Sequence, residues 1–562
     1  MDPIKNFRTL NFKRLLPPLL LLLAGFGAYH NSFTVPFMFD DSSVIFKYNS
    51  FVRQLDRGWA AFLARRSLVD FSFGLNYVFG GRDVVGYHGV NFIAHVLAAF
   101  LLYRIVDWTL QSAKLSRRYS KVAGGIALSV ALIWVCHPIQ TQSVTYLSQR
   151  AEILMGVFYL MTLLCFIRGT HSTHKNYWFA ACILFCTLGQ LAKEIMVTAP
   201  LAVLFYDYAF VSYSWKELWS RHWFLYLGLS FSWFLFLGTF FSDAVVSKSV
   251  GLSLPGISPW DYAWTEPRVI LHYLGLCFWP KSLCLDYAWP IARDRIEILP
   301  FLIVFFIFIA TLLLWRRQPA LGFSGLCFFL ILAPTSSFIP IADAAAEHRM
   351  YLPLATVTTL TVVGGYEILK CLFDRIQIWD RVRSFIFFLL VLGLVAGLSV
   401  QTIRRNSDYR KPEWIWGDVV KKQPNNPRGY YNLATVLREQ GHLEEATANY
   451  VRALSIKPDY ADAHNSLGWI LQQKGNTETA SFHYHKALES DPKHLEALNN
   501  LGTLALGQGD IQTAIGYFSK ALKLYPNNFM AAHNLNVARE MQLNPGKMPF
   551  RFNYQESDHS RG

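Results

Sequence analysis

Ionisable side chains recur along this chain directly beside long apolar segments. Two aspartates, Asp40 and Asp41, follow the first such segment. Four later connections carry comparable groups, namely His137, Gln140, Gln142, Gln149, Arg150 and Glu152, then Lys193 and Glu194, then Glu266, Arg268, His272, Asp286 and Tyr287, then Asp343, Glu347, His348, Arg349 and Tyr351. Charged groups at a membrane edge are costly and usually functional. Carboxylates and cations together would suit a reaction in which a hydroxyl group attacks and a phosphate departs.

The composition divides the chain into two unlike parts. The 562 residues are 53% hydrophobic and only 16% charged, whereas a soluble domain carries roughly 25% charged residues. From Arg410 onward there are 17 basic and 15 acidic residues, so most of the net charge of +14 belongs to the part before it. A basic, apolar body followed by a polar tail excludes a small secreted scaffold, a disordered chain and a single soluble enzyme.

Eleven apolar segments are expected to span a membrane. The first, residues 15–37, exceeds the ~20 residues that a crossing needs, and it follows basic residues without a small-residue cleavage site, so it is expected to be an anchor. The other ten cover residues 87–106, 122–136, 153–167, 177–191, 195–210, 223–240, 298–315, 321–339, 352–369 and 385–400. Residues 269–279 are too short to cross, which favours a re-entrant or interfacial segment.

Basic residues in alternate connections orient these spans. With eleven spans, every basic cluster falls on the side of the N-terminus, including Lys114, Arg117, Arg118 and Lys121 in one connection. Cytoplasmic connections carry the excess of Lys and Arg. This pattern predicts a cytoplasmic N-terminus and a C-terminal tail on the opposite side.

The polar tail repeats itself every 34 residues. Prolines, glycines and alanines hold this period in three separate columns, which are Pro424, Pro458, Pro492 and Pro526, then Gly441, Gly475 and Gly509, then Ala446, Ala480 and Ala514. A period of 34 is that of the tetratricopeptide repeat (TPR), a pair of helices. The sequence therefore predicts three repeats and a partial fourth over residues 410–541, after a membrane domain over residues 1–403 and before a loose tail over residues 546–562.

A fourth column of polar residues lies in the first helix of each repeat, one position before a leucine that is expected to pack that helix. Its members are Asn432, Ser466, Asn500 and Asn534. An asparagine side chain can both donate a hydrogen bond to a peptide backbone and accept one from it. The column predicts a groove that binds an extended acceptor peptide. The alternative is that these residues only pack helices near the repeat junctions.

Several long motifs resemble the transmembrane-and-TPR-containing (TMTC) glycosyltransferase-like family. They are FMFDDSSVI, GYHGVNFIAH, HPIQTQSVTYLSQRAE, LAKEIMVTAPLAVLFYDY, TEPRVILHYLGLCFWP with LDYAWP, PTSSFIPIADAAAEHRMYLP and the repeat array, in this order over nearly the whole chain. The animal pattern resembles HPxHTE where this chain has Gln140 and Gln142. That departure and the short array resemble a bacterial-type member, and they leave a metal site there in question.

The resemblance implies an all-α fold, with a polytopic GT-C-type membrane bundle of about eleven spans followed by a TPR α-solenoid. It also implies an inverting enzyme that transfers a monosaccharide, mannose or another hexose, from a polyprenyl-phosphate carrier to Ser or Thr hydroxyls of proteins. The partners would be the lipid-linked donor, an acceptor protein or peptide and membrane lipid, without nucleic acid. A divalent cation stays an open alternative, and no other cofactor is expected. The location would be a bacterial inner membrane, or the endoplasmic reticulum membrane in a eukaryote, with the repeats periplasmic or luminal.

The resemblance also suggests roles for single residues. An acidic residue of the first outer loop would be the general base, so Asp41 or Asp40 is expected there, although Asp40 could instead cap a following helix. Arg349 and then Lys193 are expected to bind the donor phosphate; Arg150 and Arg268 are weaker candidates that an interfacial anchor would also explain. Supporting roles fall to Glu152, Glu194, Glu347, His348, His137 and Tyr351.

Three polar residues inside the second span have a structural interpretation. His88, Asn91 and His95 share one helix face and are expected to form interhelical hydrogen bonds.

Two other classes of protein remain as alternatives for the whole chain. One is a non-catalytic membrane-anchored TPR scaffold, and the other is a lipid-linked oligosaccharide ligase, for which the chain lacks a long late outer loop.

Overall fold

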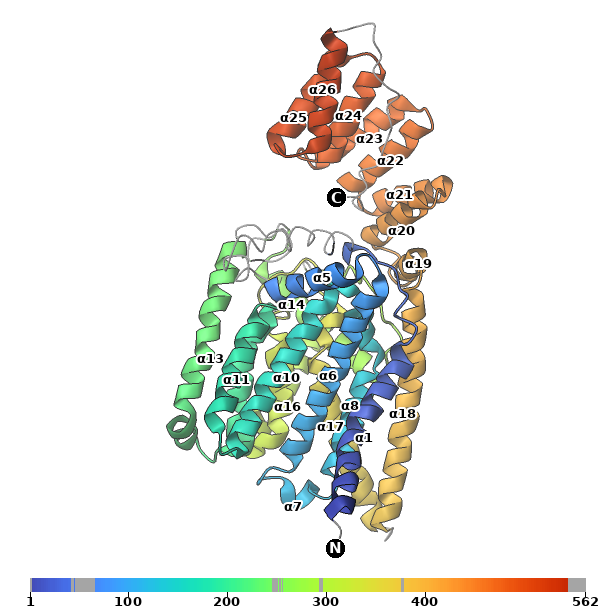
Figure 1. The fold of residues 1–562 in the computed structure, drawn as a ribbon. Coiled ribbons are helices and arrows are strands. Elements are labelled where there is room, and N and C mark those ends of the chain that lie inside the picture. Colours follow the sequence, from blue (N-terminus) through green and yellow to red (C-terminus); the bar gives the residue numbers. More distant parts are fainter. Residues whose placement is uncertain are drawn as a thin grey trace. The chain divides into compact units, whose positions relative to one another are not determined.

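The computed structural model describes residues 3–41, 45, 66–244, 251, 254, 256–292, 297–375 and 379–543. Within these residues the chain is all-α (Figure 1), which confirms the expected fold class. Contacts divide it into two compact units. The first comprises Met1–Leu285 and Trp289–Lys411, and the second comprises Pro412–Arg561 together with Asp286–Ala288. The tail predicted over residues 546–562 lies outside the described residues.

Long helices running side by side form the first unit, here called the bundle (Figure 1). Its longer helices are α1 (Pro3–Tyr29), α5 (Ser67–Gly80), α6 (Val84–Leu110), α8 (Ala123–Val135), α10 (Arg150–His171), α11 (Lys175–Gln190), α13 (Trp215–Ala244), α14 (Pro259–Phe278), α15 (Ile298–Arg317), α16 (Pro319–Leu332), α17 (Pro353–Arg375) and α18 (Asp380–Asp408). Shorter helices lie between them, namely α7 (Ser116–Tyr119), η2 (Pro138–Gln140), α9 (Thr141–Thr145), η3 (Leu147–Gln149), η4 (Glu194–Thr198), α12 (Ala199–Tyr206), η5 (Asp207–Val211) and η6 (Glu347–Met350).

Each of the eleven expected spans falls on one of these helices or on a short run of them. By length and composition, five described helices could cross a membrane, and a bent pair would make six. They differ in burial: 67% of the most apolar window in Leu147–His171 is buried, against 6% in Ile298–Arg317. The α10 helix is therefore interior and α15 faces outward. The count of eleven spans stays a prediction.

Several expected spans end elsewhere in the structure. The first was expected to reach residue 37, but α1 ends at Tyr29. The ninth was expected to reach residue 339, but α16 ends at Leu332. Pro334 follows two residues later, and a proline has no backbone N–H with which to continue the helical hydrogen bonds. The last was expected to end at residue 400, whereas α18 continues to Asp408. Its extra turns bring Asn406 against other helices, as described below.

The second unit is a stack of paired helices, here called the solenoid. Its helices are α19 (Pro412–Lys422), α20 (Pro427–Glu439), α21 (Leu443–Ile456), α22 (Ala461–Gln473), α23 (Thr477–Ser490), α24 (Leu495–Gly507), α25 (Ile511–Leu524) and α26 (Phe529–Leu543). The aromatic column Tyr450, Tyr484 and Phe518 is fully buried, as the repeat predicts. Gly441, Gly475 and Gly509 connect paired helices with φ of +83°, +79° and +83°, a backbone region that favours glycine.

Candidate active site

A break between two helices fixes where the loop after α8 begins. This loop, residues 137–149, is here called the central loop. Helix α8 and the helical stretch Pro138–Thr145 are bent by 52° with respect to each other. His137 lies at the break because it precedes a proline and takes an extended conformation, with φ −73° and ψ 130°. Its imidazole accepts from the Ile139 amide and its Nε2 lies 3.0 Å from the Cys277 carbonyl. Both ring nitrogens therefore have protein partners.

Asp41 is buried against this loop. Its side chain is 1% exposed, and its two oxygens accept hydrogen bonds from the Met38 amide at 3.0 Å and the Ser148 amide at 2.7 Å. Burial raises the pKa of the Asp41 carboxyl to about 7, although the two amides lower it, and the neighbouring Asp40 raises it further. Asp40 is exposed. The pKa of Asp41 suits a base near neutral pH.

Arg150 fastens the start of α10 to α5 and α6. Its guanidinium donates to Asn91 Oδ1 and Asn76 Oδ1, both at 2.7 Å, and to the Tyr87 carbonyl at 3.0 Å. It also lies over the Phe73 ring at 4.1 Å, and the side chain has no exposed surface. Arg150 is thus bound by protein groups on several sides, and donor binding by it stays a prediction.

Glu152, two residues further along α10, forms a buried ion pair with Lys193, whose side chain is 10% exposed. The second carboxylate oxygen, Oε2, is buried and has no hydrogen-bond partner among the described residues. His348 Nε2 lies 3.9 Å from Glu152 Oε1. Residues from α10, from the connection after α11 and from η6 therefore converge, although 41 positions separate Glu152 from Lys193 and 196 separate it from His348.

Gln142 holds His348 in place. Its Oε1 accepts from the His348 amide at 2.8 Å and from Nδ1 at 3.1 Å. Because a carbonyl oxygen only accepts, Nδ1 carries the proton and Nε2 is left unprotonated. Burial lowers the pKa of His348 well below its usual value, and the nearby Lys193 and Arg349 lower it further. The imidazole is therefore neutral. Gln140 makes a parallel contact, since its Nε2 donates to the Tyr351 carbonyl at 3.2 Å.

Arg349 is 5% exposed and binds backbone carbonyls of its own connection. Nη1 donates to Ala344 O at 2.7 Å and to Thr335 O at 3.2 Å, and Nη2 donates to Asp343 O. Tyr262 Oη lies 3.4 Å from Nη1. Within the described residues these bonds leave Nε without an acceptor. Arg349 thus supports the loop and, in the part of the chain that the structure describes, keeps two N–H groups, one on Nε and one on Nη2, for another partner.

The remaining candidates lie at different places. Arg268 pairs with Glu297 at 3.0 Å and is 32% exposed, and among the described residues no hydrogen bond or ion pair joins it to the residues above. Glu194 lies 3.8 Å from Arg66. Glu347 is buried and accepts from the Cys284 amide. Tyr351 Oη lies 3.0 Å from His95 Nδ1, in the bundle interior.

Two of the three expected interhelical hydrogen bonds of the second span are confirmed, whereas His88 bonds to the connection after α1 and not to a helix. His88 Nε2 lies 2.9 Å from the Val35 carbonyl, Asn91 donates to the Val144 carbonyl at 3.2 Å, and His95 Nε2 lies 3.1 Å from the Val135 carbonyl. These bonds tie α6 to the first outer connection, to the central loop and to the end of α8.

One supporting residue was missed by the sequence reasoning. Asn406 accepts from Thr145 at 2.7 Å and donates to Asn31 Oδ1 and the Ala28 carbonyl, both at 3.3 Å. It joins α18, α1 and α9. The only signal in the sequence is a polar residue shortly after an apolar run, and the expected end of that span at residue 400 concealed it.

Possible metal ligands are sparse. Over the parts of the chain that the structure describes, no three His, Cys, Asp or Glu side chains converge as a metal site would require. At Gln140 and Gln142, amides hydrogen-bond to the connection at 343–351. The structure offers no set of ligands to which a cation can be assigned.

In the solenoid, the polar column lies on equivalent helices. Asn432, Ser466, Asn500 and Asn534 belong to α20, α22, α24 and α26. Asn500 donates to Asn465 Oδ1 at 2.9 Å, and Asn432 Nδ2 is buried without a hydrogen-bond partner in the described chain. Ser466 is 6% exposed. Asn500 therefore packs two helices together, whereas Asn432 has a donor without a partner among the described residues. Both interpretations of the column, helix packing and a peptide-binding groove, keep support.

The fold and these buried polar clusters define a helical bundle with apolar spans joined in sequence to a TPR array. Family models for tetratricopeptide repeats match residues 417–448, 434–475, 461–494 and 495–528. The predicted repeats are confirmed. A crystal structure of MamA protein is 19% identical over 23% of this chain and 71% of its own, with a TM-score of 0.22, too low to carry an argument.

Relatives that match 70–80% of the chain are named protein O-mannosyl-transferases. F38B6.6 of Caenorhabditis elegans is 24% identical, over 70% of this chain and 54% of its own. The tmtc2 protein of Xenopus laevis is 23% identical, over 80% and 63%, and human TMTC1 is 24% identical, over 71% and 49%. The chain spans about half to two thirds of the length of these relatives. The predicted resemblance to TMTC proteins is confirmed.

Proposed function

We propose that this chain is a membrane protein O-glycosyltransferase that uses Asp41 as its general base. The observation that carries the proposal is the buried Asp41 carboxylate, whose pKa of about 7 lets it accept a proton from an acceptor hydroxyl near neutral pH. The similarity to protein O-mannosyl-transferases supports the reaction class.

The donor in this proposal is a hexose, most simply mannose, on a polyprenyl phosphate. The residues Gln142, Glu152, Lys193, His348 and Arg349 are here called the loop cluster. Within it, Lys193 and Arg349 both act electrostatically on His348, so two cations lie near one point. Fixed cations stabilise the charge that a departing phosphate gains. The open Nε of Arg349 gives the phosphate a donor, and Glu152 Oε2 gives a sugar hydroxyl an acceptor. Apolar helices around the cluster would let the lipid-linked donor approach within the bilayer.

The solenoid is proposed to bind the acceptor protein on the non-cytoplasmic side. TPR arrays present concave surfaces to partners, and the unused Asn432 donor could bind a peptide carbonyl. Mass spectrometry of glycopeptides from cells with and without the protein would name the sugar and the acceptor together. A TPR scaffold would leave the glycopeptides unchanged.

A pH–rate profile tests the base. Only the carboxylate form of Asp41 can take the proton, and it predominates above the pKa of about 7. The transfer rate with a radiolabelled polyprenyl-phosphate sugar should therefore be constant above that pH and fall about tenfold per pH unit below it. A rate that stays flat down to pH 5 in folded protein would remove Asp41 from this role.

A further inference from the structure

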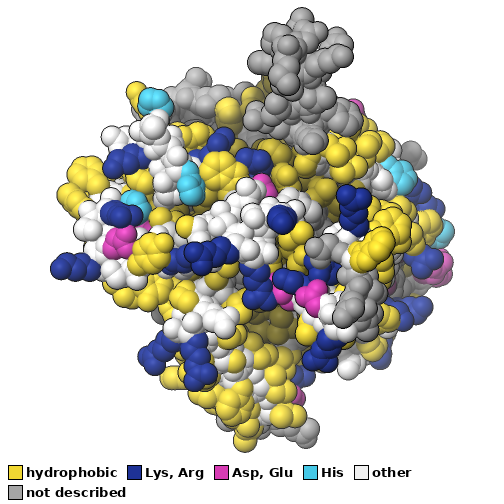
Figure 2. Space-filling view, turned by 90° about the horizontal axis from the view of Figure 1, so that it is seen from below, with side chains coloured by type: hydrophobic (Ala, Val, Ile, Leu, Met, Phe, Trp, Pro, Cys, Tyr) yellow, Lys and Arg dark blue, Asp and Glu magenta, His cyan; other side chains and the backbone are white. Residues whose placement is uncertain are grey.

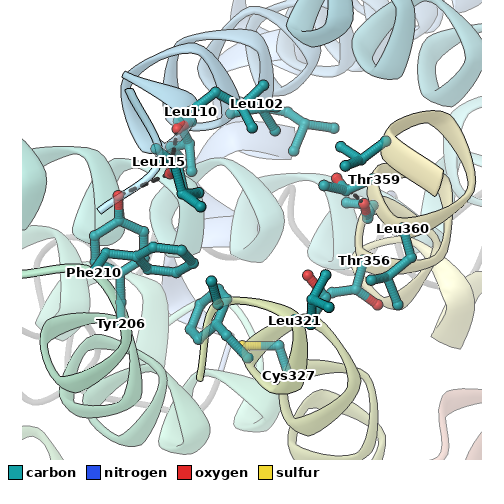
Figure 3. Close-up of a pocket in the computed structure, with 18 of the residues that line it drawn as sticks. Leu102, Leu110, Leu115, Tyr206, Phe210, Leu321, Cys327, Thr356, Thr359 and Leu360 are labelled. Carbon is teal, nitrogen blue, oxygen red and sulfur yellow. Dashed lines mark hydrogen bonds between the residues drawn. The ribbon is translucent and has the colours of Figure 1, made fainter. Parts of the chain in front are cut away.

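A cavity of about 520 Å³ opens inside the bundle, between α6, α10, α12, α16 and α17 (Figure 3). Its wall is mainly apolar, with Leu102, Leu110, Phe210, Leu321 and Leu360 among the side chains that line it. None of the residues assigned above to the loop cluster lines it. The cavity is thus a separate feature of the bundle.

Most hydroxyl groups on the wall are already bonded to protein. Thr109 Oγ1 and Tyr206 Oη bond to each other at 2.8 Å, and Thr356 and Thr359 donate to carbonyls of their own helix at 2.8 and 2.7 Å. An occupant therefore needs no polar groups along most of its length. Dry apolar cavities of about 150 Å³ take up benzene, so this one has room for a hydrocarbon on the order of eighteen carbons.

One end of the cavity is charged. Arg118 and Glu367 line it and form a two-fold hydrogen-bonded pair, at 2.8 and 2.5 Å. A second hollow shares these two residues and adds Lys370, Cys371, Asp374 and Arg375.

In this second hollow, the positively charged side chains outnumber the carboxylates. Asp374 forms an ion pair with Arg383 at 2.9 Å. Within the described chain, neither Lys370 nor Arg375 has a carboxylate within 4.0 Å. Glu367 also interacts electrostatically with Lys370, but the positive charges still outnumber the negative ones where the apolar cavity ends.

The surrounding face of the bundle is basic. Figure 2 views the end that carries the N-terminus and α7, and it shows Lys and Arg side chains spread over an apolar surface. The charge pattern of the sequence predicts that this end is cytoplasmic. Anionic lipids concentrate in that leaflet and attract basic residues.

We propose that the cavity binds a hydrocarbon chain of an anionic phospholipid whose phosphate lies at Lys370 and Arg375. The apolar wall accepts the chain, and the unpaired cations at its end select the headgroup charge. This site does not depend on the proposed transferase activity, because it shares no residue with the loop cluster.

Native mass spectrometry of the full chain tests the site, with phosphatidylglycerol and phosphatidylcholine of identical acyl chains as probes in mixed nanodiscs. Wild-type protein should retain one phosphatidylglycerol preferentially. A Cβ at Gly364, which lines the cavity, or at its neighbour Gly365, which does not, would meet no atom within 4 Å. Gly364→Phe should fill the cavity and lower the retained lipid at least tenfold, whereas Gly365→Phe should retain it.

A variant that changes only the charges tests the site even if Gly364→Phe does not fold. Lys370→Gln with Arg375→Gln should lower the preference for phosphatidylglycerol by about fivefold per charge removed. Arg316→Gln, on a residue that lines neither hollow, should leave it unchanged. Equal retention of both lipids by wild type, equal loss in the two glycine variants, or displacement of the bound lipid by a polyprenyl phosphate would overturn the proposal.

Discussion

The bundle and the solenoid are both all-α, but their polar side chains find partners over very different distances in sequence. In the bundle, 107 positions separate Asp41 from Ser148, and 206 separate Gln142 from His348. In the solenoid, Asn500 bonds to a residue 35 positions away and Tyr450 to one 15 positions away.

This difference teaches how damage should spread in each region. A solenoid repeat contacts mainly its neighbours, so its stability is a sum of local terms. The bundle holds its polar groups through buried contacts between remote segments, where an unpaired group has no water to bind. Lesions in the bundle should therefore have larger effects than lesions in the solenoid.

The largest effect is expected from Asp41→Asn. Asparagine keeps the shape and loses the basicity, so the transfer rate should fall roughly 10²–10⁴-fold. The rate is measured with a radiolabelled lipid-phosphate sugar on purified protein of known folded fraction. Asp83→Asn is the matched control, because Asp83 is an exposed helix cap of α6 and asparagine caps helices as well. Near wild-type turnover in Asp41→Asn would contradict the assignment.

Next comes the buried pair of Glu152 and Lys193. Replacing either one by Gln leaves a buried charge without its partner, which should lower the free energy of unfolding by about 3–5 kcal/mol. The double variant should recover much of that loss. Denaturant unfolding of all three variants in detergent gives the coupling between the two residues. Simple additivity of the two single losses would show that the pair is not coupled.

Arg349→Lys should have a smaller effect, on two quantities at once. Lysine keeps the charge but lacks the planar fork that bonds several carbonyls together. Losing a charge-assisted hydrogen bond costs about 1.5–3 kcal/mol, so donor-lipid binding should weaken roughly tenfold or more, with a lower melting temperature. Unchanged donor binding together with a lowered melting temperature would leave Arg349 only its role in supporting the loop.

In the solenoid, Gly468→Val should cost less and act locally. A Cβ at Gly468 would lie 2.8 Å from the Tyr484 ring, and overpacking a core typically costs about 1–3 kcal/mol. Hydrogen exchange should rise in α22 and α23, while Asp41-dependent transfer to a soluble acceptor peptide persists. Gly516→Ala is the control, because a Cβ there meets no atom within 4 Å. A loss of structure that extends through the bundle would contradict the comparison.

The smallest effect is expected from Asn432→Ala. A neutral hydrogen bond contributes about 0.5–1.5 kcal/mol, so the affinity for an acceptor peptide found by glycopeptide analysis should fall only a few-fold. Asn449→Ala is the matched control, since Asn449 is half-buried and, among the described residues, bonds only to a carbonyl of its own helix, that of Glu445. Equal affinities for both variants would favour helix packing as the only role of Asn432.

The sequence by itself determined the solenoid and the helices of the bundle. A 34-residue period places Gly475 at a positive-φ junction and Tyr484 in a core without any reference to distant residues, because each repeat packs against its neighbours. Apolar length likewise indicates helices such as α6 and α15, because lipid and core both favour continuous hydrophobic segments.

Only the tertiary structure decided how the ionisable residues pair. The sequence could name Asp41, Glu152 and Arg349, but it could not show that Asp41 is the buried aspartate, that Glu152 pairs with Lys193, or that Arg349 binds carbonyls of its own connection. It could not place Asn406 either. These outcomes depend on which remote segments meet and exclude water, and burial then sets both the pKa of a carboxyl group and the partner that a charge needs.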